Sequence, residues 1–177
     1  SGLVGSEMCI RDSKNTGRPL PQGAWFQKFR SNYLDVDNEP LYPFGYGLSY
    51  TTFEMKAEVL KNTGDEITVS VTVSNTGEVR GKEVVQVYVK VPQGKLGNPA
   101  RKLIGFAKTK ELAPGEQEEV CIVIQKYDMA SYDDSGVTGH KSCYVLEEGG
   151  YEVFVGSDVR SAVSVGCYEE EFRVIEE

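Results

Sequence analysis

A strict alternation of apolar and polar residues in residues 66–75, EITVSVTVSN, constrains the fold more than any other feature of this chain. β-Branched residues occupy every second position, and Thr or Ser stands between them. A period of two residues is that of a β-strand with one buried face, and it does not fit a helix. We therefore predict a half-buried strand. Its buried side is formed by Ile67, Val69, Val71 and Val73.

Similar strand signals recur along the rest of the chain, with turns at intervals of roughly 8–12 residues. Residues 147–149 are predicted to join two of these strands as a hairpin, and residues 126–139 form a polar, turn-rich connection. We find no convincing helix. This pattern predicts an all-β fold, a two-sheet sandwich over residues 54–177. The predicted strands are 53–61, 66–75, 82–91, 102–108, 116–125, 142–146, 150–156 and 163–174.

An aromatic stretch, LYPFGYGLSYTTF, precedes the first strand and occupies residues 41–53. Its proline and two glycines exclude a regular helix and make a poor central strand. Its rings are too apolar for a free linker, because such side chains stabilise whatever they pack on. We predict an ordered turn packed on the sandwich, and we call it the aromatic hinge. Its candidate domain-interface residues are Tyr42, Phe44, Tyr46, Tyr50 and Phe53.

Two further segments lie before the aromatic hinge. Residues 1–13 match no periodic pattern and look like translated adapter sequence, so we expect a non-native or disordered tail; a genuine flexible terminus stays open. Residues 14–40 read as an extended loop with aromatic anchors such as Trp25. We expect Trp25 to join the domain interface by packing against a neighbouring body.

Composition excludes some partners without selecting one. The 177 residues carry a net charge of −8, with 40% hydrophobic and 26% charged residues. An acidic chain of this kind argues against nucleic acid and anionic membranes as partners. No apolar run approaches the roughly 18 residues of a membrane helix. Residues 1–13 have no apolar core of a signal peptide.

Few residues suggest chemistry. Cys121, Cys143 and Cys167 lie in strand-like stretches; buried free thiols and one disulfide both remain open. With no CxxC pair and His140 as the single histidine, we expect no metal site and no cofactor. A calcium site at Asp133-Asp134-Ser135 is conceivable but not demanded, and acid–base catalysis there is disfavoured.

Two tyrosines in the turn-rich connection invite a second interpretation. Tyr127 and Tyr132 could form a sugar-stacking platform if their rings were exposed. We favour the alternative, in which they cap the open end of the sandwich.

Several motifs in one order resemble the C-terminal end of glycoside hydrolase family 3, the β-glucosidase and β-xylosidase family. The resemblance implies a fibronectin type III-like, immunoglobulin-type sandwich. It also makes residues 14–40, which begin KNTGRP, the tail of a preceding α/β-sandwich domain. The motifs are LYPFGYGLSYTTF (41–53), VSVTVSNTG (69–77), GKEVVQVYV (81–89), PARKLIGF (99–106), LAPGE (112–116) and GGYEVFVGS (149–157).

The resemblance implies an enzyme whose catalytic residues lie elsewhere. A retaining glycosidase needs two carboxyl groups about 5–5.5 Å apart. The family's nucleophile belongs to an SDW-type motif that is absent here, and its acid/base lies upstream of residue 14. Ser157-Asp158-Val159 resembles the SDW-type motif only superficially. We therefore assign no catalytic, cofactor or metal residue to this chain.

The resemblance also implies the chain's partners and setting. We expect a structural role in support of catalytic domains of the same polypeptide, which act on carbohydrate. The parent enzyme would be periplasmic or extracellular, with its signal outside this chain. Its sugar specificity and oligomeric state do not follow from the sequence. The alternative is an independent carbohydrate- or protein-binding sandwich module.

Overall fold

The computed structural model describes residues 41–176 and contains ten strands and one short 3-10 helix there. The predictions for residues 1–13, for residues 14–40 and for Trp25 fall outside this range. Because that four-residue helix is the only one in the described range, no helix there could span a membrane. The strands are β1 (Phe53–Asn62), β2 (Glu66–Asn75), β3 (Val84–Lys90), β4 (Lys102–Lys108), β5 (Gln117–Gln125), β6 (Ser131–Asp133), β7 (Cys143–Leu146), β8 (Gly149–Gly156), β9 (Val163–Glu170) and β10 (Arg173–Glu176); the helix is η2 (Lys126–Met129).

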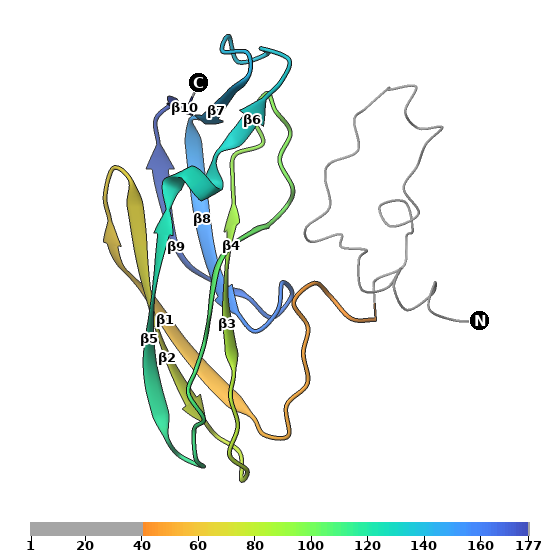
Figure 1. The fold of residues 1–177 in the computed structure, drawn as a ribbon, viewed down its shortest axis with the longest axis vertical. Helices are drawn as coiled ribbons and strands as arrows, with labels where there is room; N and C mark the ends of the chain where they lie inside the picture. Colours follow the sequence, from red (N-terminus) through yellow and green to blue (C-terminus); the bar gives the residue numbers. More distant parts are fainter. Residues whose placement is uncertain (1–40, 177) are drawn as a thin grey trace, which may run out of the picture.

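Two antiparallel sheets form the sandwich, and the all-β prediction is confirmed. One sheet has the order β1-β2-β5 and the other the order β4-β3-β8-β9. A small third sheet, β10-β7-β6, lies at the end of the molecule where η2 leaves β5 (Figure 1). The fold class is a two-sheet β-sandwich, as the spacing of the predicted strands implied.

The core lies between the two large sheets, where the alternating residues of β2 meet those of β3. Ile67, Val69, Val71 and Val73 are all fully buried, as predicted from their spacing. Val85, Val87, Val89 and Val91 of the facing sheet join the same cluster. Gly105 of β4 lets the sheets approach, because a Cβ there would stand 3.1 Å from Ile122. Burial of one face of each sheet therefore fixes their register.

The predicted hairpin across residues 147–149 is wrong. β7 pairs with β6 and β10, whereas β8 pairs with β3 and β9. The chain changes sheets at Glu147, whose buried carboxylate accepts a hydrogen bond from the Lys95 backbone N–H at 2.6 Å. Gly149 follows with a φ of 131°, which favours glycine. The segment between β7 and β8 is therefore held by the contact of Glu147 with Lys95, which is distant in sequence, and not by a hairpin between the two strands.

Two other segments also differ from prediction because the chain changes sheets within them. Residues 163–174 were predicted as one strand, but β9 pairs with β8 and β10 pairs with β7. Residues 126–139 were predicted as a connection without regular structure, but they contain η2 and β6. Both differences add strands to the small third sheet.

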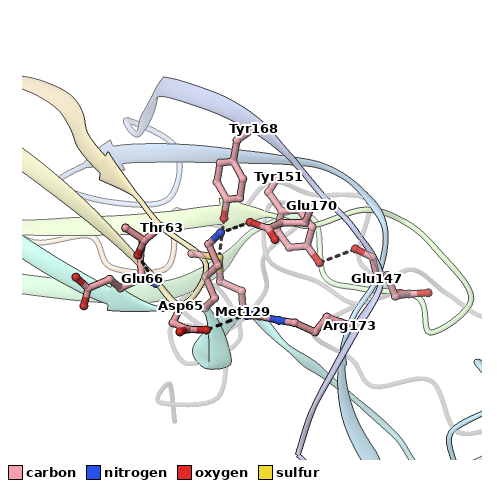
Figure 2. A network of polar contacts seen from close by, with 10 residues as sticks. Thr63, Asp65, Glu66, Met129, Glu147, Tyr151, Tyr168, Glu170 and Arg173 are labelled. Carbon is pink, nitrogen blue, oxygen red and sulfur yellow. Dashed lines mark hydrogen bonds and ion pairs between the residues drawn. The ribbon is translucent and has the colours of Figure 1, made fainter.

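Polar contacts tie η2 to β9, and a separate ion pair ties β10 to the turn between β1 and β2 (Figure 2). Lys126 is 4% exposed and forms a buried ion pair with Glu170. The Tyr168 hydroxyl donates to the Met129 sulfur at 3.0 Å, and the Arg173 guanidinium contacts Asp65 at 3.2 Å. A buried charge must be paired to be tolerated, so the Lys126–Glu170 pair holds η2 against β9.

The three cysteines between residues 41 and 176 are free thiols. Cys143 is buried, as expected, but Cys121 and Cys167 are exposed, because they point away from the core on β5 and β9.

Candidate domain-docking surface

The backbone of the aromatic hinge is fixed to the outer face of the β4-β3-β8-β9 sheet. The Phe44 carbonyl accepts a hydrogen bond from the Val159 N–H at 3.0 Å. The Gly45 carbonyl accepts one from Gln86 Nε2 at 2.9 Å, and the Tyr88 hydroxyl donates to Gln86 Oε1 at 2.6 Å. In Figure 1 the hinge, drawn in orange, runs beside β3 before it enters β1. The backbone of the aromatic hinge therefore packs on the sandwich, as predicted.

Gly45 allows this close approach. Its φ is +81°, a conformation that side chains rarely adopt, and a Cβ there would lie 2.6 Å from the Tyr88 hydroxyl oxygen. The Tyr46 N–H donates to the Pro43 carbonyl at 3.0 Å and closes a turn around Gly45. Pro43 itself is buried. The proline and glycine that exclude helix in the sequence thus shape a tight turn against the sheet.

The side chains of the hinge remain largely uncovered. Tyr42, Phe44 and Tyr46 are 39%, 42% and 43% exposed, while Leu48 and Tyr50 are 84% and 98% exposed. The Tyr42 and Tyr46 rings lie 5.1 Å apart, and Phe44 meets Tyr88 edge-on at 6.5 Å. Contiguous exposed apolar side chains on a fixed backbone mark an interaction surface.

The last residues of the hinge belong to the sandwich. Phe53 begins β1 and packs against the main core. The Thr51 hydroxyl donates to Asn75 Oδ1 at 2.7 Å, and a Cβ on Gly77 would stand 2.8 Å from the Thr52 nitrogen. Of the predicted interface residues, Tyr42 and Tyr46 lie together, Phe44 lies against Tyr88, and Tyr50 is the most exposed. Phe53 is directed inward.

A second buried cluster supports the hinge from below. It consists of Tyr88, Phe154, Val159 and Ala162, with Leu103 packed against it. Arg101 lies 4.0 Å above the Phe154 ring and donates to the Val159 carbonyl at 2.5 Å. Burial raises the pKa of Tyr88, so its hydroxyl keeps the proton that it donates to Gln86.

These supporting residues were not among the predicted interface residues. The available signal was Gln86 and Tyr88 on the non-core side of the predicted strand 82–91. A polar and an aromatic side chain adjacent on an outer face indicate that something covers that face.

Asp133, considered as a catalytic or calcium-binding candidate, stabilises the turn that follows it. The buried Asp133 carboxylate accepts hydrogen bonds from the N–H groups of residues 135–138 and from the hydroxyls of Ser135 and Thr138. Burial alone would raise its pKa, but the bonds from Thr138, Gly136 and Ser135 outweigh burial and hold the pKa far below its usual range. These donors occupy the lone pairs that a cation would need.

Asp158 and His140 have equally local roles. Asp158 Oδ1 accepts from the Arg160 and Ser161 N–H groups at 2.7 and 2.9 Å. His140 stacks on Phe172 with ring centroids 5.6 Å apart. Within residues 41–176 no three His, Cys, Asp or Glu side chains gather as a metal site would require.

Comparison with known proteins identifies the domain. Residues 83–159 match the family described as "Fibronectin type III-like domain". A β-glucosidase from Ruminococcus albus is 54% identical over 121 residues, and a putative β-xylosidase from Formosa agariphila is 42% identical over 134 residues. The crystal structure of a β-glucosidase from Paenibacillus barengoltzii superposes with a TM-score of 0.74 at 47% identity and covers 79% of this chain. The chain carries a fibronectin type III-like domain that matches the C-terminal region of family 3 β-glucosidases and β-xylosidases.

The chain spans only a small part of these relatives. The alignments cover 68% of this chain but 13% of the Ruminococcus enzyme, and 73% of this chain but 17% of the Formosa protein. The match to the Paenibacillus structure covers 16% of that protein. These relatives therefore have further domains that the match does not include.

Proposed function

We propose that this chain is the C-terminal part of a family 3 glycoside hydrolase of β-glucosidase type and supports its catalytic domains. In this proposal residues 14–40 are the tail of an α/β-sandwich domain, residues 41–53 are the hinge, and residues 54–177 are the sandwich. The full enzyme would hydrolyse terminal β-linked sugars with carboxylates supplied by the other domains.

The observation that carries this proposal is the contrast within the aromatic hinge. Its backbone is fixed by Gln86 and Val159, yet Leu48 and Tyr50 are 84% and 98% exposed. Full burial of one such side chain contributes about 1.5–3 kcal/mol. A fixed surface with this unused apolar area fits a domain that is held against another part of the same polypeptide.

A domain exchange tests the proposal. In the Paenibacillus barengoltzii β-glucosidase, residues 41–177 of this chain replace the matching C-terminal region. We expect this chimera to hydrolyse an aryl β-glucoside. The double substitution Leu48→Asp and Tyr50→Asp should lower both its activity and its melting temperature, because two charges would enter the interface.

Val137→Asp provides the matched control, because Val137 is exposed in a polar loop away from the hinge. A double variant that keeps the activity and heat stability of the chimera would refute the docking role.

A further inference from the structure

Three tyrosines gather on the outer face of the small third sheet. Tyr132 of β6 and Tyr144 of β7 are direct partners across the ladder, with ring centroids 5.0 Å apart. Tyr127 of η2 lies 5.2 Å from the Tyr144 ring. Tyr127 is 41% exposed, Tyr132 50% and Tyr144 36%, and neither buried cluster includes them. That Tyr127 and Tyr132 cap the open end of the sandwich stays a prediction, and Tyr144 was not predicted to join them.

The structure holds these rings in place from beneath. Tyr127 lies next to Lys126, whose ion pair with Glu170 is buried. Met129, two residues further on, is buried in the core. Tyr132 precedes Asp133, whose carboxylate fixes the following loop. The rings are therefore presented by a rigid support, which lowers the entropy cost of binding a ligand.

A groove of about 510 Å³ lies beside these rings, bounded by β4, η2 and Tyr144. Phe106 lines it and is 69% exposed. Two side chains of opposite charge, Lys102 and Asp128, also line the groove. Lys102 Nζ donates to the Ala130 carbonyl at 3.2 Å. We call this region the tyrosine groove; its volume lies within the range of about 300–1,000 Å³ for small-ligand sites.

We propose that the tyrosine groove binds a short segment of a neutral β-linked glucan. A pyranose ring has an apolar C–H face that stacks on an aromatic ring and a rim of hydroxyls that need donors and acceptors. Tyr127, Tyr144 and Phe106 offer the aromatic faces, while Lys102 donates and Asp128 accepts. The balanced pair of charges suits an uncharged ligand, and the net charge of −8 disfavours acidic polymers.

The choice of a glucan rests on the proposed function, because β-glucosidases act on such chains. The groove would then hold part of a longer substrate away from the catalytic domains. Its charged pair also distinguishes it from the aromatic hinge, which contains no charged residue.

Calorimetric titration of the 177-residue chain with cellopentaose and with laminaripentaose tests this inference. We expect saturable binding of at least one of them. Tyr144→Ala should weaken it about tenfold, since it removes the ring that touches both other tyrosines. Tyr144→Phe should retain most of the affinity if stacking dominates. Val123→Ala, an exposed apolar residue on β5 of the other large sheet, should leave it unchanged.

Two further variants keep the test valid if Tyr144→Ala does not fold. Phe106→Ala and Asp128→Asn change exposed side chains of the groove, and each should also weaken binding. Absence of binding to both sugars at millimolar concentration would overturn the inference. Affinity unchanged in Phe106→Ala and Asp128→Asn would overturn it too.

The two proposals fail separately. Hydrolysis of a small aryl β-glucoside by the chimera tests the docking role and does not need the tyrosine groove. Glucan titration of the isolated chain tests the groove and does not need the catalytic domains.

Discussion

At the scale of single residues, Gly45 decides whether the aromatic hinge can reach the sheet. Gly45→Ala should destabilise the chain by about 1–3 kcal/mol, because the new Cβ meets Tyr88 and the positive φ is strained. Urea unfolding followed by fluorescence measures this loss. Gly47→Ala is the control, since nothing lies within 4 Å of that position and its φ is not positive. Equal losses at both glycines would contradict the tight turn.

Asp133 gives the fold a pH dependence of known sign. Its pKa is lower in the folded than in the unfolded chain, where about 3.9 is usual, so its charge stabilises the fold above that pH. The stabilisation is lost as the pH falls through the lower, folded pKa. Urea midpoints should therefore separate wild type from Asp133→Asn most at pH 6 and least near pH 2.

Asp134→Asn is the matched control for that series, because Asp134 is the exposed neighbour. Its midpoint should follow that of the wild type at every pH. A constant difference between wild type and Asp133→Asn from pH 6 to pH 2 would rule out the ionised carboxylate as the source.

At the scale of elements, sequence periodicity found most strands but not their partners. The predicted strands 66–75 and 102–108 have the bounds of β2 and β4, because alternation reports which face is buried. It carries no information on which strand lies alongside. The changes of sheet at Glu147 and between β9 and β10 therefore escaped prediction, since they depend on contacts distant in sequence.

The candidate docking surface was likewise predicted only in part. The proline and glycines of the hinge indicated a packed turn, and its aromatic residues indicated an interface. Which rings face outward depends on where Gln86 and Val159 hold the backbone. For that reason the sequence could not separate Phe53, which joins the core, from Tyr50, which is exposed.

Glu147 offers a test of how the loop between β3 and β4 is held. Glu147→Ala removes the acceptor of the Lys95 N–H, so the chain should lose about 1–3 kcal/mol of stability. Hydrogen exchange at the Lys95 amide should accelerate. Glu148→Ala, at the exposed neighbouring position, should change neither quantity. Unchanged exchange at Lys95 in Glu147→Ala would show that the loop is held by other contacts.

At the scale of the whole molecule, the hinge should contribute more stability in the enzyme than in the isolated chain. Phe44 is 42% exposed here, so Phe44→Ala should cost about 1–2 kcal/mol, below the 3–5 kcal/mol of a fully buried ring. In the Paenibacillus chimera the same substitution should lower the melting temperature further, because the exposed part of the ring would be covered. Val71→Ala, within the sandwich core, should have similar effects in both contexts. If Phe44→Ala and Val71→Ala kept the same ratio in the chain and in the chimera, the hinge would not be a docking surface.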